Sequence, residues 1–100
     1  MYAIALIRYR RPLEEVLTAL DPHRAYLRGL QERGLLIASG PLDPWTGGAL
    51  LLRVPDESPH AALDRIRDED PYTRKGFVQY EIWPWKPVLG KEALDGIGAK

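Results

Sequence analysis

Residues 2–9 read YAIALIRY and end at the charged, proline-containing segment Arg10-Arg11-Pro12. A short apolar run that is bounded in this way predicts a β-strand. In an antiparallel sheet, a strand with one wet face should alternate apolar and polar residues. Both alternating sets of this strand are apolar instead: Tyr2, Ile4 and Leu6 on one face, Ala3, Ala5 and Ile7 on the other. We therefore expect both faces of the strand to need cover.

The rest of the chain adds three more strand patterns and two helical patterns to this first strand. The strand patterns cover residues 35–39, 49–54 and 77–83, and the helical patterns cover residues 21–34 and 58–70. The resulting order, βαββαβ, is typical of the ferredoxin-like fold. We predict an α+β domain in which two helices cover one face of a four-stranded antiparallel sheet. A different two-layer arrangement is the alternative.

Each predicted helix begins at a capping residue that is followed by proline. Asp21-Pro22 and Ser58-Pro59 have this pattern, and a helical turn over residues 13–20 precedes the first of them. The expected main contacts between the helices and the sheet are Leu27, Leu30, Leu63 and Ile66.

The second face of the predicted sheet is also apolar, and two helices cannot cover it. The third strand repeats the pattern of the first, with Leu50 and Leu52 on one face and Ala49 and Leu51 on the other. A large exposed apolar face marks an interaction surface. We therefore expect a symmetric homodimer that pairs sheet against sheet. The alternative is that the tail from Lys86 onward folds across this face.

Composition excludes several classes of function. Fourteen basic and fourteen acidic residues give a net charge of zero, which argues against nucleic-acid and anionic-membrane partners. The absence of cysteine excludes disulfides and thiol catalysis. No signal-peptide pattern and no apolar run of about 20 residues are present, so a cytoplasmic location is expected. The sequence has no metal-ligand or nucleotide-binding spacing, and we expect no cofactor.

Two inward-facing polar residues, His23 and Asp70, are the main candidates for chemistry. His23 lies in the first turn of the first main helix, on the stripe of Leu27 and Leu30, and Asp70 ends the second helix one turn beyond Ile66. The βαββαβ order brings these two helix ends to the same end of the sheet. A carboxylate that accepts from one imidazole nitrogen leaves the other free as a general base. A purely structural histidine is the alternative.

Other polar residues are weaker candidates. Ser39 ends the second strand at the same end as His23, and Tyr72 follows Asp70 closely, so both are candidates for substrate binding. His60 lies at the opposite end, off the apolar stripe, and is expected to be solvated.

Five segments together resemble the YciI-like (YCII-related) family over about residues 2–86. These segments are His23-Arg24-Ala25-Tyr26-Leu27, Ala38-Ser39-Gly40-Pro41-Leu42, Gly47-Gly48-Ala49-Leu50, Asp70-Pro71-Tyr72 and Pro84-Trp85. The resemblance implies a dimeric α+β barrel of ferredoxin-like subunits, with residues 1–86 as the domain and residues 87–100 as a C-terminal tail. It also implies that His23 and Asp70 match the proposed active-site dyad of the family.

The function that this resemblance implies is broad. One branch of the family acts on chlorinated hydroxyquinol-type rings, and the architecture is similar to that of muconolactone isomerases. The first hypothesis is a small cofactor-free enzyme, of lyase or isomerase type, that moves a proton on a small organic acid or cyclic enol. The second is a non-catalytic homodimer that binds an unknown small molecule. The turn over residues 13–20 and the tail depart from the family pattern and leave the shape of the pocket open.

Overall fold

The computed structural model describes residues 1–97 and has the predicted order of main elements. The four strands are β1 (Tyr2–Tyr9), β2 (Leu36–Pro41), β3 (Gly47–Arg53) and β4 (Val78–Trp85). The helices are α1 (Leu13–Val16), the 3₁₀ turn η1 (Leu17–Ala19), α2 (Leu20–Glu32), α3 (Pro59–Glu69), α4 (Pro71–Arg74) and α5 (Lys91–Gly96). No helix among residues 1–97 is both long and apolar enough to cross a membrane.

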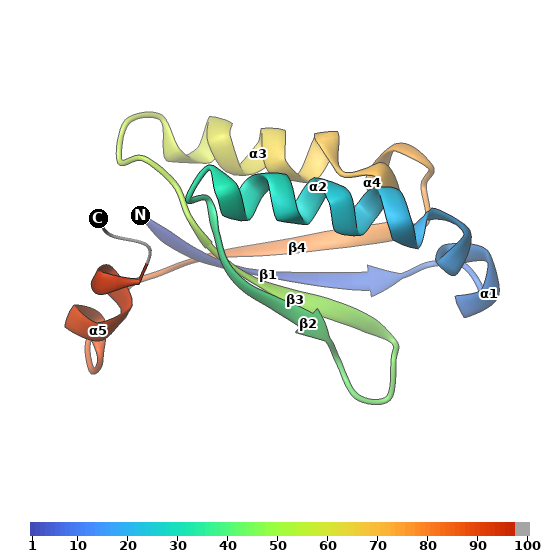
Figure 1. Cartoon of the computed structure of the whole chain (residues 1–100), viewed down its shortest axis with the longest axis horizontal. Helices are drawn as coiled ribbons and strands as arrows, with labels where there is room; N and C mark the ends of the chain where they lie inside the picture. The colour runs from blue at the N-terminus through green and yellow to red at the C-terminus, as the bar shows by residue number, and fades with distance from the viewer. Residues whose placement is uncertain (98–100) are drawn as a thin grey trace.

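The strands form one antiparallel sheet with the order β2-β3-β1-β4. β1 lies inside the sheet and pairs with β3 and with β4, so that Tyr2 is opposite both Arg53 and Trp85. β2 pairs with β3 at one edge, with a register shift between Leu36 and Ala38. Helices α2 and α3 lie side by side on one face of the sheet (Figure 1). The predicted α+β, ferredoxin-like arrangement is confirmed.

The core lies between this helical layer and the sheet. From the sheet it contains Ala3, Ala5, Ile7, Leu50 and Leu52, all buried. Leu30 of α2 and both Leu63 and Ile66 of α3 pack against them and are buried, as predicted. Leu27 is only partly buried, because its side chain lines a cavity at the end of the sheet.

The start of α2 differs from the prediction. The helix begins at Leu20 and not after Asp21, and its N-cap is Ala19, which makes no side-chain cap. The reason is that η1 runs directly into α2, with the backbone N–H of Leu20 bonded to the carbonyl of Leu17. Ser58 is the N-cap of α3 as predicted, but its side chain makes no capping hydrogen bond.

The tail contains a short helix, α5, that the sequence did not predict. It contacts the face of the sheet away from α2 and α3, and only at one end. There the Tyr2 hydroxyl donates to Asp95 at 2.5 Å, and Arg53 donates to the backbone carbonyls of Leu94 and Ile97. Further along this face Trp83 remains 57% exposed. Within residues 1–97, the tail therefore covers one end of the second face and leaves the rest open (Figure 1).

Gly47 marks the closest approach between β1 and β3, and substituting it tests the register. A Cβ atom at this position would lie 1.7 Å from the carbonyl oxygen of Ile7, whereas a Cβ at Gly40 would meet nothing within 4 Å. We expect Gly47→Ala to lower the free energy of unfolding by ~1–3 kcal/mol, since the backbone must shift to make room. Gly40→Ala is the matched control and should be nearly neutral. Equal urea midpoints for the two variants would contradict the described pairing.

Candidate functional site

The two candidate residues His23 and Asp70 meet inside the protein. Nδ1 of His23 lies 2.8 Å from Oδ1 of Asp70, within the predicted hydrogen-bond range. Asp70 is fully buried and His23 is 8% exposed. Because a carboxylate can only accept, Nδ1 carries the hydrogen and donates it. In the neutral ring this tautomer leaves the lone pair on Nε2.

Asp70 holds its position because three donors converge on its carboxyl group. It is the N-cap of α4, with Pro71 in the first turn, and Oδ1 accepts from the backbone N–H of Tyr72 at 2.9 Å. The Tyr80 hydroxyl of β4 donates a short hydrogen bond to Oδ2. Together with His23, these contacts compensate for the burial of the carboxyl group. The chain thus restarts as a helix at Asp70, which fixes the acceptor for His23.

Tyr72 orients the imidazole from a second direction. Its ring stacks on His23 with 3.8 Å between centroids and 8° between planes. Tyr9, at the end of β1, packs edge-on against Tyr72 at 6.2 Å. His23 is therefore held by a hydrogen bond in its plane and by a ring on its face, so its orientation is determined before any ligand arrives.

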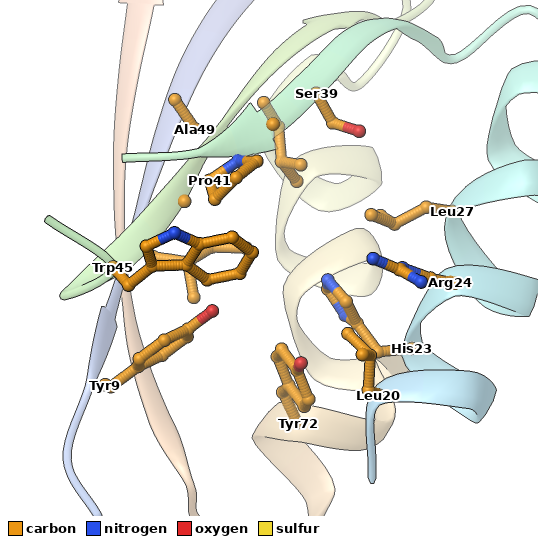
Figure 2. A pocket seen from close by; sticks show the side chains of 14 residues that line it. Tyr9, Leu20, His23, Arg24, Leu27, Ser39, Pro41, Trp45, Ala49 and Tyr72 are labelled. Atoms are coloured by element: carbon orange, nitrogen blue, oxygen red, sulfur yellow. The ribbon is translucent and has the colours of Figure 1, made fainter. Parts of the chain in front are cut away.

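A cavity of about 260 Å³ opens beside this group. It lies between the first turn of α2, the connection from β2 to β3, and the end of β1 (Figure 2). Its lining includes His23, Ser39 and Tyr72, three of the four residues that the sequence singled out; Asp70 lies behind His23. His60 lies elsewhere, on the exposed side of α3. The topology therefore brings the predicted residues to one place.

Sequence reasoning missed several residues of this site. The apolar stripe of its helix gave no role to Arg24, but Arg24 lines the cavity, because it follows His23 near the start of α2 and its side chain is long. Trp45 also lines the cavity. It lies in a loop rich in proline and glycine, where no sequence pattern pointed to it. Tyr80 was treated only as a strand residue. A buried tyrosine needs a hydrogen-bond partner, and that requirement was the available signal.

The phenol groups around the site stay protonated at neutral pH. Burial raises the pKa of Tyr72 to about 12, and nearby Tyr9 and Asp70 add to the rise. Burial and the charge of Asp70 also raise the pKa of Tyr80 far above its ordinary value. Burial raises the pKa of Tyr9 in the same direction. These hydroxyls are therefore hydrogen-bond donors over the whole physiological range.

Among residues 1–97, no group of three or more His, Cys, Asp or Glu side chains is arranged to hold a metal ion. The groups at the site are one imidazole, one carboxyl group, one guanidinium and several hydroxyls. Such a set can accept a proton, donate hydrogen bonds and neutralise a negative charge.

Comparison with known proteins places this architecture in a family. The family model for the YCII-related domain matches residues 1–86. A search of curated proteins gives no match. Among solved structures, the chain is similar to 5-chloro-2-hydroxyhydroquinone dehydrochlorinase (TftG) from Burkholderia phenoliruptrix AC1100, in complex with 2,5-dihydroxybenzoquinone. The TM-score is 0.71 at 21% identity, over 88% of this chain and 96% of that one.

At this level of identity, the structural likeness establishes a shared fold. The family match rests on the sequence of nearly the whole described chain, from β1 to the end of β4. Both findings agree with the strand order and with the position of the helices. The chain belongs to the YCII-related domain family.

Proposed function

We propose that this protein is a small cofactor-independent enzyme that transfers a proton on a small organic acid or cyclic enol. His23 is the general base or acid, Asp70 is its positioning residue, and Ser39 and Tyr72 contact the substrate. The observation that carries the proposal is the hydrogen bond from Nδ1 of His23 to Asp70 beside a cavity that His23 itself lines. A fixed base next to a space for a ligand is what general base catalysis requires.

The reaction begins when Nε2 of His23 takes a proton from an acidic carbon or hydroxyl of the ligand. The electron pair left behind forms an enolate or phenolate, and the carboxyl group of Asp70 stabilises the imidazolium that results. In an isomerisation, the imidazolium returns the proton to another atom of the ligand. In an elimination, the electron pair expels a leaving group such as chloride, and the proton passes to solvent.

The structural neighbour supports a cyclic enol as the ligand type. That protein is a dehydrochlorinase of a chlorinated hydroxyhydroquinone, and its bound ligand is 2,5-dihydroxybenzoquinone. Such rings exchange readily between enol and keto forms, which is chemistry that one imidazole can assist. We extend this ligand class to the present chain as part of the proposal.

A second candidate function is non-catalytic binding of a small molecule. The observation in its favour is the low exposure of His23, 8%, together with the Tyr72 ring that covers one face of the imidazole. In that case the pair anchors a ligand or stabilises the helix ends without moving a proton. Proton exchange on the ligand distinguishes the two candidates.

We also propose that the domain of residues 1–86 pairs with a second copy through the open face of its sheet, with residues 87–97 of the tail at the edge; residues 98–100 of the predicted tail lie outside the described residues. The centre of this face is apolar, with Ile4, Leu6 and Leu51 only partly buried. The rim is polar, since Arg8 pairs with Glu81 at 3.2 Å. An apolar centre with a polar rim is typical of a protein interface.

Light scattering during size-exclusion chromatography tests this pairing. We expect the mass of a dimer for the wild type and the mass of one chain for Leu51→Glu, because the substitution buries a charge at the centre of the interface. Arg28→Glu, on the exposed surface of α2, is the control and should remain dimeric. A wild type that runs as a single chain at tens of micromolar would contradict the proposal.

The catalytic role is tested by proton exchange. A panel of cyclic enols, hydroxyquinols and small organic acids is incubated with the protein in D₂O, and deuterium incorporation is followed by NMR. For any compound that exchanges, His23→Ala should lower the rate by about 10²–10⁴-fold, the usual contribution of a general base. Asp70→Asn should lower it by a smaller factor, since the base remains but its orientation and tautomer are disturbed.

The control variant for this experiment is His60→Ala, which removes the other histidine from an exposed position on α3. It should retain the wild-type rate. Circular dichroism of each variant separates loss of chemistry from loss of fold. A folded His23→Ala protein that exchanges as fast as the wild type would rule out the proposed base.

A further inference from the structure

The charge of the cavity is uneven, and one residue determines it. Arg24 is the only lining residue whose side chain always carries a charge. Within residues 1–97, the Arg24 guanidinium forms no ion pair and no side-chain hydrogen bond that would neutralise it. The negative group nearest to the site, the Asp70 carboxyl group, lies behind His23 and is bonded to it. An anion in the cavity is therefore best placed on its Arg24 side.

A buried donor lies near this cation. Tyr72 is 2% exposed, and its hydroxyl oxygen has no hydrogen-bond partner of ordinary geometry among the described residues, although the Tyr9 hydroxyl is near enough to raise the pKa of Tyr72. A buried hydroxyl without a partner destabilises the folded protein, and a ligand that accepts from it removes that cost. The Arg24 charge is close enough to lower the pKa of Tyr72 in part against the effect of burial. Both residues line the cavity, so the guanidinium and the hydroxyl are two donors at the same cavity.

The opposite wall of the cavity is aromatic. Figure 2 shows Trp45 and Tyr9 across the cavity from His23 and Arg24. Trp45 has a positive φ of 70°, an uncommon conformation for a residue with a bulky side chain, and it is 47% exposed. Strained backbone of this kind is often found at functional sites. An indole in this place offers a flat surface to a ligand ring.

We infer that Arg24 and the Tyr72 hydroxyl form an anion subsite, with Trp45 as the wall for an attached ring. The ligand class is a small planar monoanion: an enolate, a phenolate, or a carboxylate on an unsaturated ring. A cavity of about 260 Å³ is below the usual range for drug-sized ligands, so one ring with few substituents is the expected size. This inference rests on the proposed function only because both concern the same cavity. It further specifies the charge and the shape of the ligand.

The subsite also has a role in the proposed chemistry. Proton removal by His23 leaves negative charge on the ligand, and a cation within the same cavity stabilises that charge as it develops. His23 and Arg24 are adjacent near the start of α2, so one helix end supplies both the base and the counter-charge. Stabilisation of the product anion by Arg24 makes the proton easier to remove.

The test is equilibrium binding, measured by NMR chemical-shift titration with three probes. Benzoate is a planar monoanion, benzamide is its neutral counterpart of the same shape, and cyclohexanecarboxylate is an anion without a flat ring. We expect the wild type to bind benzoate at least about tenfold more tightly than benzamide, the usual strength of a charge-assisted hydrogen bond. It should also bind benzoate more tightly than cyclohexanecarboxylate, because a flat ring stacks on Trp45. Arg24→Gln should bring the benzoate-to-benzamide ratio near one, and Tyr72→Phe should lower it in part.

Each substitution has a control of the same residue type outside the cavity. Arg28→Gln, one turn further along α2 and outside the cavity, should keep the wild-type ratio. Trp45→Leu should remove the preference for benzoate over cyclohexanecarboxylate, whereas Trp83→Leu, on the other face of the sheet, should keep it.

Three results would overturn the inference: no benzoate binding at millimolar concentrations, equal binding of benzoate and benzamide, or an unchanged ratio in a folded Arg24→Gln protein. The outcome is independent of catalysis because no turnover is measured. Benzoate selectivity that depends on Arg24, in a protein that exchanges no proton on any ligand, would leave the anion subsite standing and contradict only the proposed function. Proton exchange on a ligand, in a protein that does not prefer benzoate to benzamide, would support the proposed function and contradict the anion subsite.

Discussion

The buried carboxyl group of Asp70 is the contact on which the site depends. It joins the distant helix α2 to the segment around α4 and β4, because it accepts from His23 of α2, from the backbone of Tyr72 in α4 and from Tyr80 of β4. An unpaired carboxyl group at zero exposure would be costly, so all three donors must be in place when the chain folds. The same contacts that satisfy Asp70 fix the orientation of His23. Stability and the geometry of the base are therefore linked.

The two faces of the sheet have different surroundings. On one face, α2 and α3 bury Ala5, Ile7 and Leu50, and the cavity opens where this layer ends. On the other face, α5 covers only the end near Tyr2. β1 contributes apolar side chains to both faces, which explains why its sequence does not alternate in polarity.

The sequence predicted the main strands and helices and the meeting of His23 with Asp70, because those rest on periodicity and on topology. Hydrophobic stripes placed both residues inward, and the βαββαβ order placed them at one end. The starting residue of α2 was wrong, since η1 supplies the preceding backbone contacts and no start signal is needed. Arg24 and Trp45 were missed because their roles depend on side-chain reach and on loop conformation, neither of which has a periodic signature.

The most direct test of the central claim is the tautomer of His23 in the wild-type protein. Long-range ¹⁵N–¹H NMR correlations distinguish the two imidazole nitrogens, and His60→Gln removes the only other histidine signal. At a pH where the ring is neutral, Asp70 should hold the hydrogen on Nδ1 and leave Nε2 unprotonated. The Asp70→Asn protein should show a changed mixture of tautomers. A neutral His23 that carries its hydrogen on Nε2 in the wild type would contradict the account.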